Sequence, residues 1–245
     1  METDVVTISI LGSAMTADSH AAAVLSADVI YQSAATGGSC WSRNHLDHRR
    51  ELPMTRWMGG VAATPQDRLA DEHVLRQCSS RPTLDLGCGP GRFTAWLQER
   101  GLPALGVDSS ATAVQMTRQR GGTAIHRDVF APLPAEGSWA QILLADGNIG
   151  IGGDPVQTLR RTASLLAHGG VVIVEIDSAT TESCYEWMRW ETEHYLGQWF
   201  PWSRVGARTL GDIARAAGFC VTQIIEIHDR VIAVLSMAAR GGKKR

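Results

Sequence analysis

The sequence has no strong charge bias and no segment suited to a membrane. Its 245 residues carry a formal net charge of −2, which gives no general attraction for nucleic acid or an anionic lipid surface. No apolar run approaches the length of a membrane span, and Glu2 and Asp4 replace the positive start of a secretory signal. We therefore expect a cytoplasmic protein, of one domain or one domain with a cap, that binds neither nucleic acid nor membrane.

Cysteine patterns for metal binding are also missing. No C-x-x-C and no zinc spacing occurs, and a scattered, odd set of thiols is typical of a reduced compartment. His45, Asp47 and His48 offer ligand atoms, but histidines in a polar stretch are more often solvated. We predict no metal site. The sequence contains five cysteines: Cys40, Cys78, Cys88, Cys184 and Cys220.

Secondary-structure signals divide the chain into two parts. Residues 18–35 are alanine-rich and predict a helix, whereas residues 36–60 look irregular. Thr64, Pro65 and Asp67 then form a capping-box pattern that begins a helix. From residue 82 onward, apolar strand-like runs alternate with helix-like segments, which predicts a mostly parallel α/β sheet.

The later part of this pattern predicts the end of one helix and the position of a hairpin. Asp154 caps a helix that we expect to stop at Gly169. Residues 219–239 contain two strand-like runs around His228, which predict an antiparallel hairpin at the sheet edge.

A glycine loop, LDLGCGPGR, occupies residues 84–92. It follows a strand and opens a helix, which is the context of a nucleotide-binding loop. Its glycines, Gly87, Gly89 and Gly91, do not match the G-x-G-x-x-G dinucleotide fingerprint. Asp85 lies just before the loop, and Asp108 ends the next strand, where a carboxylate can bind ribose hydroxyls.

The segments LDLGCGPGR, GVDSS, RDVF, LLADGN and LLAHGGVVIVE together resemble the motifs of class I S-adenosylmethionine-dependent methyltransferases. The resemblance runs from about Thr64 to Leu235, and the first 60 residues are similar to a group of actinobacterial small-molecule methyltransferases. It implies a Rossmann-like seven-stranded sheet, mostly parallel with an antiparallel C-terminal hairpin strand. It divides the chain into an N-terminal cap (1–63), a methyltransferase domain (64–240) with a tryptophan-rich insertion (181–206), and a basic tail (241–245).

The resemblance also implies a cofactor, S-adenosylmethionine, and roles for individual residues. Asp108 binds the ribose, Asp128 faces the adenine amino group, and Val129 offers a backbone N–H to the ring. Asp85 either supports the cofactor's amino group or only braces the turn. The implied cofactor-binding residues are Asp85, Gly87, Cys88, Gly89, Gly91, Asp108, Ser109, Asp128, Val129, Ala145, Asp146 and Gly147.

A second glycine-rich segment, LLADGNIGIGGDP, spans residues 143–155. A phosphate is a poor fit because the segment has no G-x-x-x-x-G-K-[ST] pattern and no nearby lysine. Ligands of open α/β sheets bind beyond the carboxyl ends of the strands. We therefore expect the methionine end of the cofactor and the methyl acceptor to approach here, although Gly152 and Gly153 can also be explained as turn residues.

Methyl transfer mainly requires that the acceptor atom, the methyl group and the sulfur lie in line. It requires a general base only if the acceptor must lose a proton. Candidate bases are Asp146, His45, His48 and His194. We favour His194, because a helix over residues 184–197 would bring it toward one face with Trp187, Trp190, Glu191 and Tyr195. The predicted catalytic residues are His194 and Asp146.

Eight tryptophans are many for this length, and such rings suit a bound small molecule. The alternative is that they pack a cap onto the core. Arg204 can pair with an acidic acceptor or lie on the surface. The predicted substrate-binding residues are Tyr31, Trp41, Trp57, Asn148, Trp187, Trp190, Glu191 and Arg204.

Several alternatives stay open. Asp146 with Asp177 or Glu175 imitates the magnesium ligands of some O-methyltransferases, but the Asp–Asn pair of those enzymes is absent. An NAD(P)-dependent oxidoreductase would share the sheet, and a non-catalytic S-adenosylmethionine-binding protein would share the loop. A nucleic-acid methyltransferase would be expected to show a basic face. We expect a small-molecule acceptor as the partner and leave a homodimer open.

Overall fold

The computed structural model describes residues 27–78 and 81–238. The predicted basic tail and most of the alanine-rich segment lie outside these ranges, but residues 27–35 are helical as expected. None of the helices in the described ranges has the length and apolar character needed to cross a bilayer.

The larger of two sheets has the strand order β10-β11-β7-β6-β3-β4-β5. All pairs are parallel except β10 with β11 and β11 with β7, so the predicted Rossmann-like sheet with a C-terminal hairpin is confirmed. Its strands are β3 (Thr83–Leu86), β4 (Ala104–Asp108), β5 (Ala124–His126), β6 (Trp139–Leu144), β7 (Leu166–Ile176), β10 (Phe219–Ile227) and β11 (Arg230–Met237).

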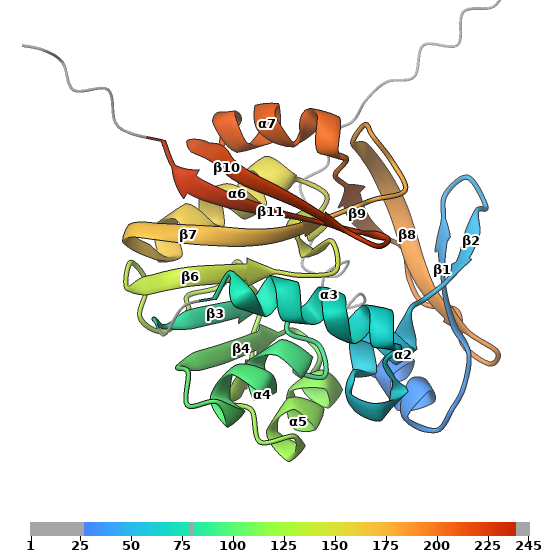
Figure 1. Cartoon of the computed structure of the whole chain (residues 1–245). Helices are drawn as coiled ribbons and strands as arrows, with labels where there is room; N and C mark the ends of the chain where they lie inside the picture. The colour runs from blue at the N-terminus through green and yellow to red at the C-terminus, as the bar shows by residue number, and fades with distance from the viewer. Residues whose placement is uncertain (1–26, 79–80, 239–245) are drawn as a thin grey trace, which may run out of the picture.

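Helices cover both faces of this sheet, with α3 in front and α6 behind in Figure 1. The capping box at Thr64 is present, and Ser110 and Asp154 also cap helices through their side chains. The helices are α2 (Met54–Met58), α3 (Pro65–Arg76), α4 (Arg92–Glu99), α5 (Ala111–Gln119), α6 (Pro155–Leu165) and α7 (Ala207–Ala216), with short 3₁₀ turns at Gly60–Ala62 and Asn148–Gly150.

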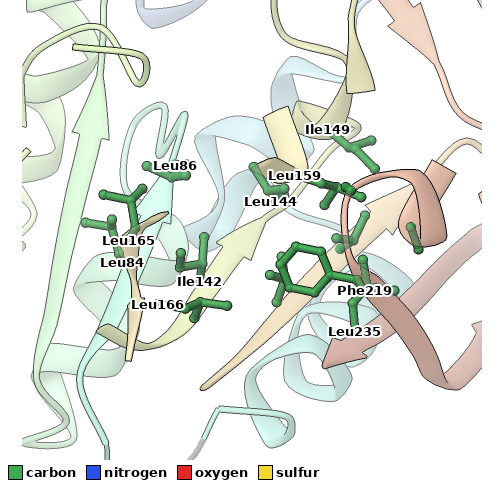
Figure 2. Close-up of a cluster of buried hydrophobic side chains, with 14 of the residues drawn as sticks. Leu84, Leu86, Ile142, Leu144, Ile149, Leu159, Leu165, Leu166, Phe219 and Leu235 are labelled. Carbon is green, nitrogen blue, oxygen red and sulfur yellow. The ribbon is translucent and has the colours of Figure 1, made fainter. Parts of the chain in front are cut away.

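Period-2 alternation divides the apolar residues of the strands between two cores. Ile142 and Leu144 of β6 face the cluster that α6 and α7 cover (Figure 2). Leu143 points the other way, to the cluster covered by α3 and α4. A sheet buried on both faces requires near-continuous apolar strands, which explains the runs that the sequence shows.

The smaller sheet has the order β2-β1-β8-β9, and its pairs are antiparallel. It stands to the right of the large sheet in Figure 1. Its strands are β1 (Cys40–Asn44), β2 (Arg49–Glu51), β8 (Cys184–Thr192) and β9 (Phe200–Arg204).

This sheet corrects three predictions. Residues 36–60 are not irregular, because they contain β1, β2 and α2. The helix predicted over 184–197 is wrong, because β8 pairs along its length with β1 on one side and β9 on the other. In the large sheet, α6 ends at Leu165 rather than Gly169, because Leu166 already pairs with Trp139 of β6.

A buried network of charges links four elements of the large domain. Arg230 of β11 donates to both carboxylate oxygens of Glu175 on β7, at 2.7 Å each, and to Asp71 of α3 at 2.5 Å. Asp71 also accepts from Arg92 of α4 at 3.0 Å. Arg92 in turn holds both oxygens of Asp146, at 2.6 and 3.0 Å.

Removing Arg230 should strongly destabilise the fold, because its side chain is 1% exposed and its loss leaves buried carboxylates unpaired. We expect Arg230→Met to lower the free energy of unfolding by about 3–5 kcal/mol in urea titrations. The control is Arg215→Met, whose partner Asp212 is exposed, with an expected loss below about 1 kcal/mol. Equal losses in the two variants would contradict a structural role for the network.

Candidate functional site

One cavity of about 480 Å³ lies between the two sheets. Its floor is formed by residues at the carboxyl ends of β3, β4, β6 and β7, and its roof by β1, β8 and β9. Ligands of open α/β sheets bind at this edge of the strands.

The glycine loop requires its glycines at two close approaches. Gly87 has φ +73°, and a Cβ there would lie 2.5 Å from Asn148 Nδ2. Gly91 has φ +78°, and a Cβ there would lie 2.4 Å from Thr117 Cγ2. Because side chains are excluded at both positions, the backbone of the loop packs directly against Asn148 and Thr117.

Asp108 is held by the loop that it faces. Its Oδ2 accepts from Gly89 N and its Oδ1 from Ser110 N, both at 2.8 Å. Burial raises the pKa of this carboxyl above its ordinary value. Each oxygen retains a lone pair for a ligand hydroxyl.

Asp85 is a buried carboxyl with an unused acceptor. Thr94 donates to Oδ2 at 2.7 Å, whereas Oδ1 has no partner among the described residues. Burial raises the pKa of Asp85 to about 7. An unpartnered buried carboxylate oxygen is unfavourable unless a donor approaches it.

Residues 27–35 cover the glycine loop. Asp28 accepts from Ser110 Oγ at 2.5 Å and from Thr112 N at 2.9 Å, which fastens this helix to the start of α5. The Tyr31 hydroxyl lies over the loop, 3.1 Å from where a Cβ on Gly89 would be. Burial, and after it the charge of Asp108, raises the pKa of Tyr31 well above its ordinary value, so this hydroxyl stays protonated.

The glycines of the segment 143–155 divide between the cavity and contacts with the small sheet. A Cβ on Gly150 would lie 1.8 Å from the Ser203 carbonyl oxygen, and one on Gly153 would lie 2.6 Å from the Tyr185 ring. These two glycines therefore admit the protein's own strands β9 and β8. Gly147, in contrast, lines the cavity and has nothing within 4 Å of a built Cβ.

Asp146 is poorly suited to act as a general base. Burial alone would raise its pKa, but the Arg92 guanidinium holds the pKa of this carboxyl below its ordinary value. Its backbone has φ +52°, and its N–H donates to Glu175 at 3.0 Å. The residue lines the cavity, so its position favours a role in holding the loop or the cofactor.

The roof of the cavity is one face of the small sheet. Side chains alternate between the two faces of a strand, so β8 presents Glu186, Met188 and Trp190 to the cavity. Neighbouring strands add Ser42 and Asn44 from β1, and Phe200, Trp202 and Arg204 from β9.

The remaining candidates from these strands lie on the opposite face. Trp41 packs under Arg49, with the guanidinium carbon 3.8 Å from the ring centre. Trp187 is partly exposed beside Tyr185. Glu191 is buried in ion pairs with arginines 43, 49 and 189. A helical period is wrong for this segment, which is a strand. The two-residue period of a strand places Trp187 and Glu191 on the face opposite Trp190.

His194 is not brought to the cavity. It follows the end of β8 with a side chain that is 93% exposed, so the prediction that it shares a helical face with the tryptophans is wrong. His45 lies outside the cavity lining, and its Nδ1 receives the backbone N–H of Trp187 at 3.3 Å. His48, in the turn between β1 and β2, lines the cavity.

The carboxylates considered for magnesium each have an arginine partner. Asp146 pairs with Arg92, Glu175 with Arg230, and Asp177 with Arg204. No group of three metal-ligating side chains occurs in the described ranges.

Most of the other predicted residues do line the cavity. Tyr31, Trp57, Asn148, Trp190 and Arg204 are among them. Asn148 also ties the two glycine segments together, since its Nδ2 donates to the carbonyls of Leu86 and Gly87 at 3.0 and 2.8 Å. Of the predicted cofactor-binding residues, those that line the cavity are Gly87, Cys88, Gly89, Asp108, Ser109, Asp128, Val129, Asp146 and Gly147; Asp85, Gly91 and Ala145 do not.

A sequence profile described as a methyltransferase domain matches residues 54–224. The chain therefore belongs to this family, in its class I S-adenosylmethionine-dependent form. Its cofactor is S-adenosylmethionine, and the product of that cofactor is S-adenosylhomocysteine. The family match decides against the NAD(P)-dependent alternative.

The chain is similar to several methyltransferases, of which three are described here. A trans-aconitate 2-methyltransferase of Paracidovorax citrulli is 32% identical over 110 residues, which are 43% of this chain and 42% of that relative. The match thus spans less than half the length of that relative. A S-adenosylmethionine-dependent methyltransferase of Bacteroides fragilis, solved with S-adenosylhomocysteine, has a TM-score of 0.68 at 19% identity, covering 92% of this chain and 98% of that one.

The third is a 1,6-didemethyltoxoflavin-N1-methyltransferase of Burkholderia thailandensis, with a TM-score of 0.60 at 16% identity and 92% coverage of both chains. At such identities the two structures show a shared fold.

The residues present fit the cofactor. Asp108 offers fixed acceptors for the ribose hydroxyls, and Gly87 and Gly89 line the cavity. Asp85 lies outside the lining, but its buried, unpartnered oxygen suits a donor such as an ammonium group. When bound, the cofactor supplies an activated methyl group. The individual roles of these residues stay predictions.

Replacing Asp108 should weaken cofactor binding. We expect Asp108→Ala to cost roughly 1.5–3 kcal/mol of binding free energy, as for hydrogen bonds to a charged group. Calorimetry with S-adenosylhomocysteine measures this, with circular dichroism to verify that the variant folds. An unchanged Kd in a folded variant would refute the ribose assignment.

Cofactor binding should release a proton from Asp85. Its pKa of about 7 leaves it half protonated at neutral pH, and a nearby ammonium favours the carboxylate. We expect release of about 0.5 proton at pH 7, measured by calorimetry in two buffers of different ionisation enthalpy. The release should disappear in Asp85→Asn, and persistence there would assign it to another group.

Proposed function

We propose that the protein transfers a methyl group from S-adenosylmethionine to an oxygen or nitrogen of a small molecule, in specialised metabolism in the cytoplasm. The observation that carries this proposal is the shape of the cavity. One continuous cavity is lined by Asp108 at the cofactor end and by Trp202 at the roof. A small molecule in that space meets both the methyl donor and the roof.

The roof suits an acceptor with apolar surface. Four side chains form a continuous aromatic face, which we define as Trp57, Trp190, Phe200 and Trp202. Ring centres lie 6.3 Å apart for Trp57 and Trp190, 5.0 Å for Trp190 and Phe200, and 6.4 Å for Phe200 and Trp202. Aromatic side chains bury large areas of ligand at a low cost in conformational entropy.

Residues 27–63 and 181–206 act as the cover of this site in our proposal. Arg56 of α2 supports this, because it bonds to Asp67 of α3 at 2.6 Å and to Asp229 of the β10–β11 turn at 2.8 Å. The cover is thereby tied to both sides of the large domain. A covered site excludes water and holds acceptor and methyl group in line, which is the main requirement of this reaction.

We further propose His48 as the base when the acceptor must lose a proton. Of the four candidates, Asp146 is neutralised by Arg92, and His45 and His194 lie outside the cavity lining. His48 lines the cavity and has no ion-pair partner in the described part of the chain. Its backbone N–H donates to Asn44 Oδ1 at 2.9 Å, which fixes the turn that carries it.

Trp190 and Trp187 provide a matched test, because they stand on opposite faces of β8. We screen candidate small molecules with methyl-labelled cofactor and determine KM for the best acceptor. Trp190→Ala should raise that KM about tenfold through lost ring contact, whereas Trp187→Ala should change it less than about twofold. Failure to methylate any acceptor would favour the non-catalytic alternative, and equal effects of the two substitutions would contradict acceptor binding at the roof.

A further inference from the structure

We propose that the acceptor is an amine that binds as a cation between Glu186 and the aromatic face. This inference rests on the proposed function and names its substrate class. It is carried by the charges on the cavity-facing side of the small sheet.

Glu186, near the start of β8, is a roof carboxylate that makes no ion pair within the described ranges. It lies opposite Trp202 in the β8–β9 register, two pairs away from Met188 and Phe200 and on the same face. Its Oε1 accepts from Asn44 Nδ2 at 3.3 Å and from the Cys184 thiol at 3.7 Å. No basic side chain of the described residues lies within ion-pair distance of it.

Four other carboxylates of the cavity lining are neutralised by arginines. Asp108 and Asp128 belong to the cofactor end, and Glu51 is exposed on β2. Glu186 is therefore the carboxylate beside the aromatic face that a ligand cation would meet. The neutralised pairs are Asp146 with Arg92, Glu175 with Arg230, Asp177 with Arg204, and Asp229 with Arg56.

Arginines of the lining are mostly engaged in the same way. Arg56, Arg92 and Arg204 each hold a carboxylate. Arg50 has no ion pair within the described ranges, but it lies exposed on the edge strand β2. A polyanion such as trans-aconitate would have to compete with the existing pairs for its counterions.

An aromatic face next to an unpaired carboxylate is the combination that binds organic cations, because the negative face of each ring attracts positive charge. The Glu186 carboxylate adds a second attraction for the cation at one end of the aromatic face. Asn44 connects this carboxylate to the turn of His48, since it donates to Glu186 and accepts from His48 N.

The transfer step balances for an amine. The bound ammonium first loses one proton to His48 or to water. Its nitrogen lone pair then forms the new N–C bond while the methyl–sulfur bond breaks, and that electron pair stays on the sulfur of S-adenosylhomocysteine. Glu186 takes no part in bond making and acts as a binding residue.

The test removes two opposite charges, one at a time, from the cavity-facing side of the small sheet: Glu186→Gln is the test variant and Arg50→Gln is its control. Tryptophan fluorescence of the full chain with S-adenosylhomocysteine is titrated with benzyltrimethylammonium, and separately with trans-aconitate. We expect Glu186→Gln to raise the Kd of the cation about tenfold. Arg50→Gln, which removes the opposite charge from the same sheet, should leave that Kd unchanged or lower it.

The reverse pattern would overturn the inference. In that pattern Arg50→Gln raises the Kd of trans-aconitate, and Glu186→Gln leaves the Kd of the cation unchanged. So would the absence of any cation binding to the parent protein. In parallel, methyl transfer to tryptamine is compared with transfer to indole-3-propanoate. Transfer to the acid alone would overturn the amine class and leave the proposed function intact, whereas no transfer to any acceptor would count against the proposed function itself.

Discussion

The buried chain of arginines and carboxylates is the constraint on which the site depends. Arg230 and Arg92 connect β11, β7, α3 and the start of α4 through Glu175 and Asp71. The last member of this ion-pair network is Asp146. Arg92 donates to its side chain, and its own backbone N–H donates to Glu175. The backbone at Asp146 is thereby held at φ +52°, in the left-handed region that non-glycine residues adopt uncommonly.

The loop after β6 also contacts the small sheet, which forms the roof of the cavity. Gly150 and Gly153 lie against Ser203 and Tyr185 with no room for a side chain. Ser203 Oγ also donates to the Gly153 carbonyl at 2.6 Å. The same segment thus lines the cavity at Gly147 and packs against β9 a few residues later. Ion pairing on one side of the loop and close packing on the other together position the loop between the two sheets.

Sequence reasoning succeeded where a local pattern has a local cause. The capping box at Thr64, the helix that opens at the glycine loop and the carboxylate at the end of β4 each depend on residues that are neighbours along the chain. It failed for β8, whose aromatic residues fit a strand as well as a helix. Its partner β1 is far away in sequence, with Asn44 and Glu186 separated by 142 residues. No window of the sequence contains both partners of that pair.

The sequence by itself determined the parallel sheet and the glycine loop, because these follow from short motifs and from the periodicity of apolar residues, and its resemblance to class I methyltransferases implied the cofactor. The tertiary structure decided which side chains face the acceptor. It directed Glu186 and Trp190 toward the cavity and placed Trp187 and Glu191 on the opposite face of β8, and it left His194 in solvent. The physical reason is pairing: the face that a strand residue occupies is set by its register with a distant strand, which only the folded chain brings alongside.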